Sequence, residues 1–243
     1  MIKADLHCHT IASDHAYSTV AELASYASKA GLEMIAVTDH GPAISDSPHI
    51  WHFQNLHVLP RVIDGVKILR GTEANIINTN GDIDEEFDEE TLNKLDVVIA
   101  SFHAPCGKTG TVEEHTQAYI NLIRNPHIDI LGHSGTPMFS YDIETVVKEA
   151  AKYNKIFEIN NHTFHIRKRS IENCVKIAKA CKKYGVYVTV DSDAHIAYAL
   201  GDYTNALSML KEIDFPDELI LNTSAEKVVN YLNGRTHKKQ ITF

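Results

Sequence analysis

Histidine is the residue type that stands out in this chain of 243 residues, because 15 are present. A single histidine is usually an ordinary exposed side chain, so the positions decide whether several share a role. Six histidines, one glutamate and one aspartate stand at the carboxyl ends of predicted strands. In a barrel of parallel strands those ends converge on one face, where active sites are built. These eight residues are His7, His9, His40, Glu73, His103, His133, Asp193 and His195.

Two local spacings favour a common metal site. His7 and His9 are two residues apart, as are Asp193 and His195, and in extended chain such pairs point to the same side. Cys8 then points away and suits a buried position. Imidazole and carboxylate ligands without thiolates suit zinc, manganese or iron. Because eight ligands exceed what one tetrahedral ion takes, the sequence predicts two or three ions with one bridging carboxylate.

The elements that must position these residues alternate along the chain. Short apolar runs rich in β-branched residues alternate with longer stretches of helical periodicity, which is typical of a parallel sheet with crossover helices. Strands are predicted at 2–7, 34–39, 66–73, 96–102, 128–133, 156–160 and 186–191, and helices at 20–30, 112–124, 143–153 and 171–184. Gly31 and Gly185 follow two of the helices, where a left-handed cap is expected.

The predicted fold class is α/β, a distorted TIM-like barrel of seven strand–helix units in a single domain over residues 1–243. A late apolar run at 219–221 is either an eighth strand or an extra edge, and Asn80-Gly81 predicts a hairpin turn after the third strand. An open doubly wound sheet is the competing layout. It is disfavoured because no glycine-rich phosphate or dinucleotide loop follows the first strand.

Composition narrows the classes of function. The net charge is -9 with histidine neutral, which does not favour nucleic-acid phosphates as partners. The four cysteines form no metal-binding or disulfide spacing, so we interpret them as reduced and non-catalytic. No signal-peptide layout is visible, and no apolar run approaches the roughly 18 residues of a membrane span. We therefore expect a cytoplasmic protein without a membrane partner.

Several short motifs, in this order, resemble those of the PHP (polymerase and histidinol phosphatase) superfamily. They are Asp5-Leu6-His7-Cys8-His9, Ala36-Val37-Thr38-Asp39-His40, Glu73 after an apolar strand, and Asp193-Ala194-His195. The resemblance covers essentially the whole chain. The chain length and three further segments are similar to the YcdX-type probable phosphatases of that superfamily: Trp51-His52-Phe53, Leu69-Arg70-Gly71-Thr72-Glu73-Ala74-Asn75 and Glu158-Ile159-Asn160-Asn161.

The resemblance implies three divalent ions per chain, zinc in the first place with manganese or iron as alternatives. It implies one ion held by His7, His9, Glu73 and Asp193, a second that shares Glu73 and takes His103 and His133, and a third held by His15, His40 and His195. His15 is included only because of the resemblance. It lies in the loop after the first strand, so its position at a strand end does not identify it. A homo-oligomer, as a trimer, is likewise implied by resemblance alone.

The expected reaction is hydrolysis of a small phosphomonoester by hydroxide that the two- or three-metal centre activates. A water between ions that share Glu73 has its pKa lowered from 15.7 towards about 7. No serine or cysteine nucleophile is then required. Glu73, Asp193 and His195 are the expected catalytic residues.

Other polar residues have expected supporting roles. Asp39 and Asp191 neighbour ligands and would either accept hydrogen bonds from imidazole N–H groups or cap helices and face solvent. Arg167, after the sixth strand, is a candidate for binding the substrate phosphate. Arg61 is a second candidate, although it is placed in a predicted helix. The remaining histidines are interpreted as ordinary, with only His52 and His165 kept as candidate pocket residues.

Three other functions compete with the phosphatase interpretation. An amidohydrolase barrel also begins with two histidines on its first strand, but it would place a bridging lysine on the fourth strand, where residues 96–103 contain none. A PHP-type exonuclease acting on DNA ends would be expected to have a basic groove. A metal store or regulatory binding module would have a more compact set of ligands than one spread over six strands.

Overall fold

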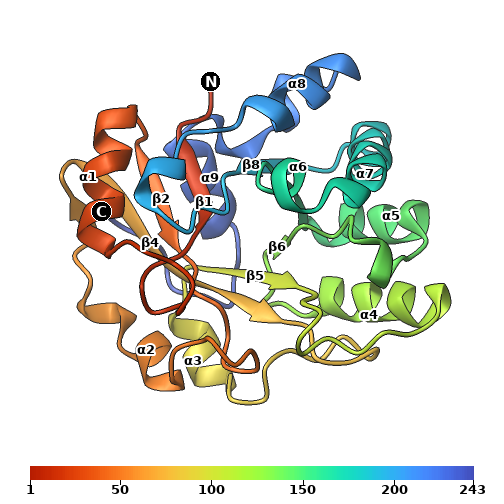
Figure 1. Cartoon of the computed structure of the whole chain (residues 1–243), viewed down its shortest axis with the longest axis horizontal. Coiled ribbons are helices and arrows are strands. Elements are labelled where there is room, and N and C mark those ends of the chain that lie inside the picture. Colours follow the sequence, from red (N-terminus) through yellow and green to blue (C-terminus); the bar gives the residue numbers. More distant parts are fainter.

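The computed structural model describes residues 1–243, and its centre is a nearly closed barrel of seven parallel strands (Figure 1). Each strand is hydrogen-bonded to the next along the chain, as predicted for a TIM-like barrel. The strands are β1 (Ala4–Cys8), β2 (Met34–Val37), β4 (Val66–Asn75), β5 (Val97–Ser101), β6 (Ile130–Leu131), β7 (Ile156–Asn160) and β8 (Val188–Asp191). A short strand, β3 (Val62–Ile63), pairs antiparallel with the start of β4.

The barrel is completed at the seam between β1 and β8 by a side chain. The amide of Asn222 donates to the carbonyl oxygens of Ala4 and Val190, both at 2.8 Å, and accepts from the N–H of Val190 at 3.0 Å. Asn222 follows the apolar run 219–221, which is not the full strand considered above. That run lies in two 3-10 turns, η5 (Asp217–Leu219) and η6 (Leu221–Thr223), and Ile220 makes one isolated parallel bridge to Val188.

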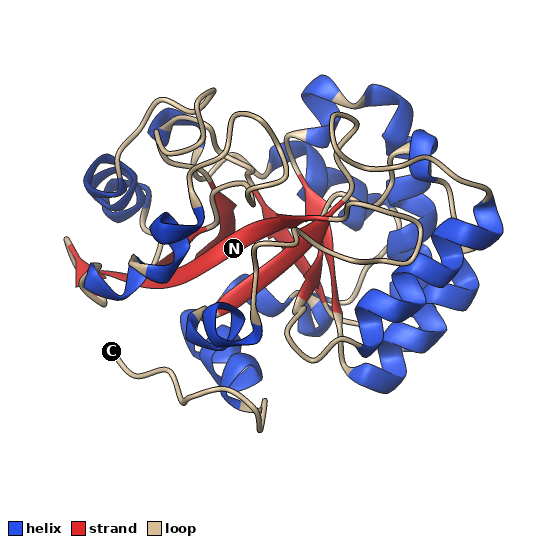
Figure 2. Ribbon diagram, turned by 90° about the horizontal axis from the view of Figure 1, so that it is seen from below, coloured by secondary structure: helices blue, strands red, loops and turns tan.

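Helices surround the strands, as Figure 2 shows in blue around red. The four predicted helices have the predicted bounds: α1 (Val20–Ala30), α4 (Val112–Arg124), α5 (Ile143–Tyr153) and α7 (Ile171–Tyr184). Capping boxes begin α1 and α4, while Gly31 and Gly185 end α1 and α7 in left-handed conformation. The others are α2 (Ile50–Gln54), α3 (Glu89–Lys94), α6 (Thr163–Ile166), α8 (Thr204–Glu212) and α9 (Ala225–Asn233).

Alternation along the strands separates two apolar cores. One face of each strand packs against the surrounding helices in a cluster of 49 buried residues. The other face forms a second cluster of 14 buried residues, which includes Leu69 and Ile156 together with Val228 and Leu232 of α9. Because alternate residues share a face, Glu73 lies on the same side of β4 as Leu69. The barrel interior therefore changes from apolar to polar towards the carboxyl ends of the strands.

Local backbone conformation explains two details of the connections. Strand β6 is shorter than predicted at both ends, and at its carboxyl end His133 has a φ of 20° and is no longer extended. The predicted turn at Asn80-Gly81 is present, since Ile76 and Ile83 form an antiparallel bridge and Gly81 has a φ of 81°. No helix combines the length and apolar character that crossing a bilayer requires.

Candidate metal centre

The carboxyl ends of the parallel strands bring the predicted ligands together on one face of the barrel. His7 lies within β1 and Glu73 within β4, while the others follow strand ends directly or within a few residues. Their side chains contact one another, although up to 188 positions separate them in the sequence (195 minus 7). His15 lies at the rim, with a side chain that is 51% exposed, whereas the other imidazoles are buried or nearly so.

Four ligand atoms have the spacing of a tetrahedral metal site. His7 Nε2 lies 3.1 Å from His9 Nε2, 3.2 Å from Glu73 Oε2 and 3.6 Å from Asp193 Oδ1. His9 Nε2 lies 3.6 Å from Glu73 Oε2 and 3.2 Å from Asp193 Oδ1. A zinc ion with ligands about 2.0–2.2 Å away requires ligand–ligand distances of about 3.3–3.6 Å. The five distances of 3.1–3.6 Å are close to this range, so these four residues are suited to one divalent ion.

Glu73 presents its two oxygens to different histidines. Oε2 faces His7, His9 and also His40, whose Nδ1 is 3.0 Å away. Oε1 faces His133 Nε2 at 2.8 Å and His103 Nε2 at 3.3 Å. A carboxylate in this position is suited to touch two ions, one on each oxygen.

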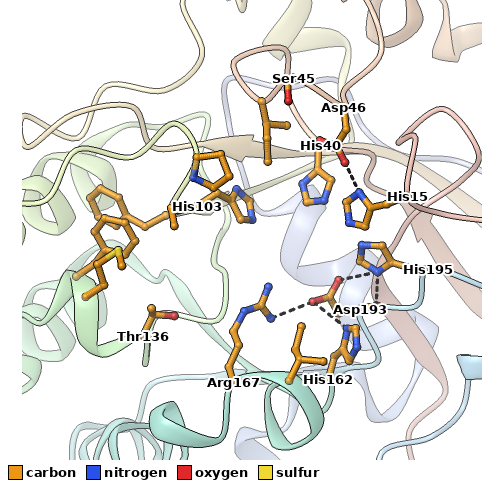
Figure 3. A pocket seen from close by; sticks show the side chains of 17 residues that line it. His15, His40, Ser45, Asp46, His103, Thr136, His162, Arg167, Asp193 and His195 are labelled. Atoms are coloured by element: carbon orange, nitrogen blue, oxygen red, sulfur yellow. Dashed lines mark hydrogen bonds and ion pairs between the residues drawn. The ribbon is translucent and has the colours of Figure 1, made fainter.

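A third group of imidazoles lies next to this pair. The rings of His15 and His195 have centroids 4.4 Å apart, and that of His40 is 5.3 Å from His15 and 6.0 Å from His195 (Figure 3). Nδ1 of His15 contacts the carboxylate of Asp46. The ligand atoms of His40 and His195 also lie within 4.8 Å of each other and of a ligand atom of His9, whereas His15 belongs to no such group. This side of the cluster can therefore hold a further ion.

Some buried polar atoms of the cluster make no hydrogen bond, which indicates whether these residues fit metal ions. His40 Nδ1, Glu73 Oε2 and His103 Nε2 are all buried, and their short contacts do not have the geometry of hydrogen bonds. Unpaired buried polar atoms are costly, and each is explained if ions complete the cluster. Burial, followed by the charge of His40, lowers the pKa of His9 to about 3, which keeps its imidazole neutral. A neutral imidazole is the form that binds a metal.

The two carboxylates are held in the charged form. Burial by itself raises the pKa of Glu73, but the charges of His7, His103 and His40 outweigh it and hold this pKa well below its usual value. Burial likewise opposes ionisation of Asp193, yet the charge of His7 and a hydrogen bond from His9 hold the pKa of this carboxyl well below its usual range. Both groups thus supply the negative charge that divalent ions require.

The residues that orient the imidazoles were missed by the sequence reasoning. Glu158, buried on β7, accepts a hydrogen bond from His7 Nδ1 at 2.5 Å, and Asn75 accepts from His103 Nδ1 at 2.7 Å. The proposed acceptors Asp39 and Asp191 bind other groups. Asp39 accepts from Thr10, Ser13 and His52, and Asp191 accepts from Leu6 and Asn222. One feature of the sequence could have identified Glu158. It lies two residues after Ile156 on the same strand, and since alternate residues share a face, both side chains point into the barrel.

A cavity of about 680 Å³ lies over the cluster. His15, His40, His103, Asp193 and His195 line it, and Arg167 reaches into it from the end of α6 (Figure 3). Nη1 of Arg167 is 3.4 Å from Asp193 Oδ2. His162, interpreted from the sequence as ordinary, also lines the cavity, with Nδ1 3.8 Å from the same oxygen.

Arg61 was placed wrongly by the sequence reasoning. It directly precedes β3 and is not helical, and its guanidinium pairs with Asp96, which precedes β5 at the amino-terminal end of the barrel. It is therefore absent from the cavity. His52 and His165 are absent from it too. His52 lines a separate surface hollow and is hydrogen-bonded to buried Asp39, and His165 is exposed near Asp202.

Comparisons with known proteins show which family the chain resembles. The family model of the PHP domain matches residues 5–169. A probable phosphatase of Acetivibrio thermocellus is 49% identical over 234 residues, covering 96% of both chains. One of Shewanella halifaxensis is 50% identical over 234 residues, covering 96% of this chain and 93% of the other.

Solved structures share the fold at lower identity. The histidinol phosphate phosphatase of Lactococcus lactis, determined with zinc, L-histidinol and phosphate, superposes with a TM-score of 0.61 at 20% identity and covers 88% of this chain and 94% of that one. An archaeal ribonuclease P structure with mature tRNA contains a chain with a TM-score of 0.59 at 13% identity, covering 95% of this chain and 90% of that one. At such identities the likeness concerns the fold alone. Together with the family match and the close relatives, it leads to one conclusion: the chain belongs to the PHP domain family.

Proposed function

We propose that this protein is a phosphoric monoester hydrolase that acts on a small phosphomonoester with two or three divalent ions. Zinc is the first choice of metal, and manganese and iron are the alternatives. The observation that carries the proposal is the position of Glu73, whose two oxygens face separate groups of histidines. Two ions that share a carboxylate are a recurring arrangement in phosphoryl hydrolysis.

The proposed ligands fall into three sets, two of which share Glu73. His7, His9, Glu73 and Asp193 would hold the first, and Glu73, His103 and His133 the second. His15, His40 and His195 would hold the third. When bound, the ions supply Lewis acidity, which lowers the pKa of water towards about 7 and neutralises charge on a phosphoryl oxygen. Glu73, Asp193 and His195 are the proposed catalytic residues.

The protein's own side chains would position the substrate. Arg167 is the one lysine or arginine among the residues that line the cavity, and its guanidinium can donate two parallel hydrogen bonds to a phosphate. Glu158 and Asn75 fix the orientation of two ligand imidazoles. A single cation suits one phosphate group better than a nucleic-acid backbone with many. The phosphatase names of the relatives, and the phosphate-bound neighbour, support the same choice.

Hydrolysis of a panel of small phosphomonoesters by protein loaded with zinc, manganese or iron tests the proposal. We expect phosphate release that depends on metal. In Arg167→Gln, KM should rise about 10- to 100-fold, since a hydrogen bond from a charged group contributes about 1.5–3 kcal/mol. Arg169→Gln is the matched control, because Arg169 is exposed and does not line the cavity. Phosphate release no faster than without protein, with every metal, would refute the function.

A further inference from the structure

The cavity over the metal cluster has an apolar side that the proposed chemistry does not use. Its residues come from the loops after β2, β5 and β6 and from α6. They are Ile44, Phe102, Pro105, Met138, Phe139 and Ile166. His103 and Thr136, which are neighbours of several of these residues in the sequence, lie across the cavity from His195 and Asp193 (Figure 3).

A stacked aromatic pair forms the base of the apolar side. The rings of Phe102 and Phe139 have centroids 4.5 Å apart and planes inclined by 12°. Phe102 also packs edge-on against Tyr119, with ring centroids 5.6 Å apart. Both phenylalanines are almost fully buried, so packing holds them in place whether or not a ligand is present. This part of the apolar side is therefore preformed.

The outer part of the apolar side is open to solvent. Met138 is 54% exposed and Ile166 is 60% exposed, and both line the same cavity as Arg167. Exposed apolar side chains gathered at one cavity mark a binding site more often than scattered ones do. A ligand that covered them would gain about 25 cal/mol for each Å² of apolar surface removed from water.

Few charged side chains line the cavity. The three non-histidine charged residues that line the cavity are Asp46, Arg167 and Asp193. Asp46 contacts His15, while Arg167 and Asp193 face each other. A charged group placed against the apolar side would lose water without gaining a partner, which is unfavourable. A volume of about 680 Å³ is also far more than a phosphate needs.

We propose that the apolar side binds the leaving group of the substrate, and that this group is uncharged and apolar, either aromatic or branched aliphatic. Met138 and Ile166 are the residues that determine this specificity. The proposal rests on the proposed phosphatase function, because it takes the phosphate to lie beside Arg167 and the metal ligands.

Three substrates with the same scissile bond test the preference: benzyl phosphate, para-carboxybenzyl phosphate and para-aminomethylbenzyl phosphate. With metal-loaded protein, kcat/KM for benzyl phosphate should exceed that for each charged analogue by about tenfold or more. Values within twofold of one another, or a preference for a charged analogue, would overturn the proposal.

A charge placed on the apolar side should change the preference. In Met138→Lys, the ratio of kcat/KM for benzyl phosphate to that for para-carboxybenzyl phosphate should fall by at least about fivefold. Ile166→Lys should act in the same direction from α6. Val58→Lys is the matched control, because Val58 is 60% exposed but lies outside the cavity, in η1 (Leu56–Val58). An unchanged ratio in both cavity variants would overturn the role of these residues.

Calorimetric binding of the corresponding phosphonates, which cannot be hydrolysed, separates this proposal from the proposed function. Tighter binding of benzylphosphonate without turnover of any ester would retain the apolar site and refute the phosphatase. Turnover with no difference between neutral and charged compounds would retain the phosphatase and refute the apolar site. Absence of both binding and turnover would refute both.

Discussion

The strongest test of how this centre is built is a substitution of Glu158, a residue that touches no proposed ion. Its side chain is fully buried between two of the histidines. Oε1 accepts from His7 Nδ1 at 2.5 Å. Oε2 accepts from the backbone N–H of His133 at 2.7 Å and from the side-chain amide of Asn160 at 3.2 Å. Both oxygens are thus occupied by donors.

Glu158→Gln keeps the size of the side chain but replaces one acceptor oxygen by an NH₂ group. That group must face either His7 or the donors of His133 and Asn160, so at least one buried donor loses its partner. An unsatisfied buried donor costs about 1–3 kcal/mol. Loss of an acceptor behind a metal-binding histidine typically costs 10- to 100-fold in metal affinity or activity. We expect the zinc Kd to rise by about that factor.

Competition with a chromophoric chelator measures the zinc Kd, and circular dichroism checks that the variant is folded. Glu149→Gln on α5 is the matched control. Glu149 is also buried and pairs with Arg124 and Lys152, both at 2.7 Å, but it lies outside the cavity. Its zinc Kd should stay within about twofold of the wild-type value. A wild-type Kd in folded Glu158→Gln would refute the orienting role.

Three further predictions concern the metals and the pH dependence of stability. Glu73→Gln removes the charge that faces both histidine groups, so elemental analysis should find at most one ion per chain and hydrolysis should be nearly lost; wild-type turnover would contradict the shared-ligand role. His15→Ala should lose about one ion and retain the pair that shares Glu73, because a three-histidine site reduced to two binds weakly; unchanged metal content would return His15 to an ordinary rim residue. Burial lowers the pKa of Lys155 from 10.5 to about 8. The folded protein therefore loses this proton first, and its stability should rise by up to about 3 kcal/mol between pH 8 and 10.5. Urea denaturation should show this gain in the wild type and not in Lys155→Met, and parallel pH profiles would contradict it.

The sequence by itself determined the barrel, the helix bounds and where the ligand-type residues stand. Side-chain caps begin α1, α4 and α5, and left-handed residues end α1, α5 and α7, so local features mark most of the helix bounds that the sequence predicts. Parallel strands place their carboxyl ends on one face, so strand-end positions alone brought residues as distant as His7 and His195 to one cluster. Alternation along β4 placed Glu73 inside the barrel.

Only the tertiary structure decided which groups face one another. Glu158 meets His7 across 151 positions, and Asn222 completes the seam beside Ala4 across 218. Arg61 and Arg167 are both arginines in connecting segments, yet one pairs with Asp96 at the far end of the barrel and the other reaches the cavity. Periodicity and capping are properties of neighbouring residues, whereas these pairings depend on how loops and turns pack across the closed barrel. The apolar side of the cavity has the same origin, because its residues come from four separate segments.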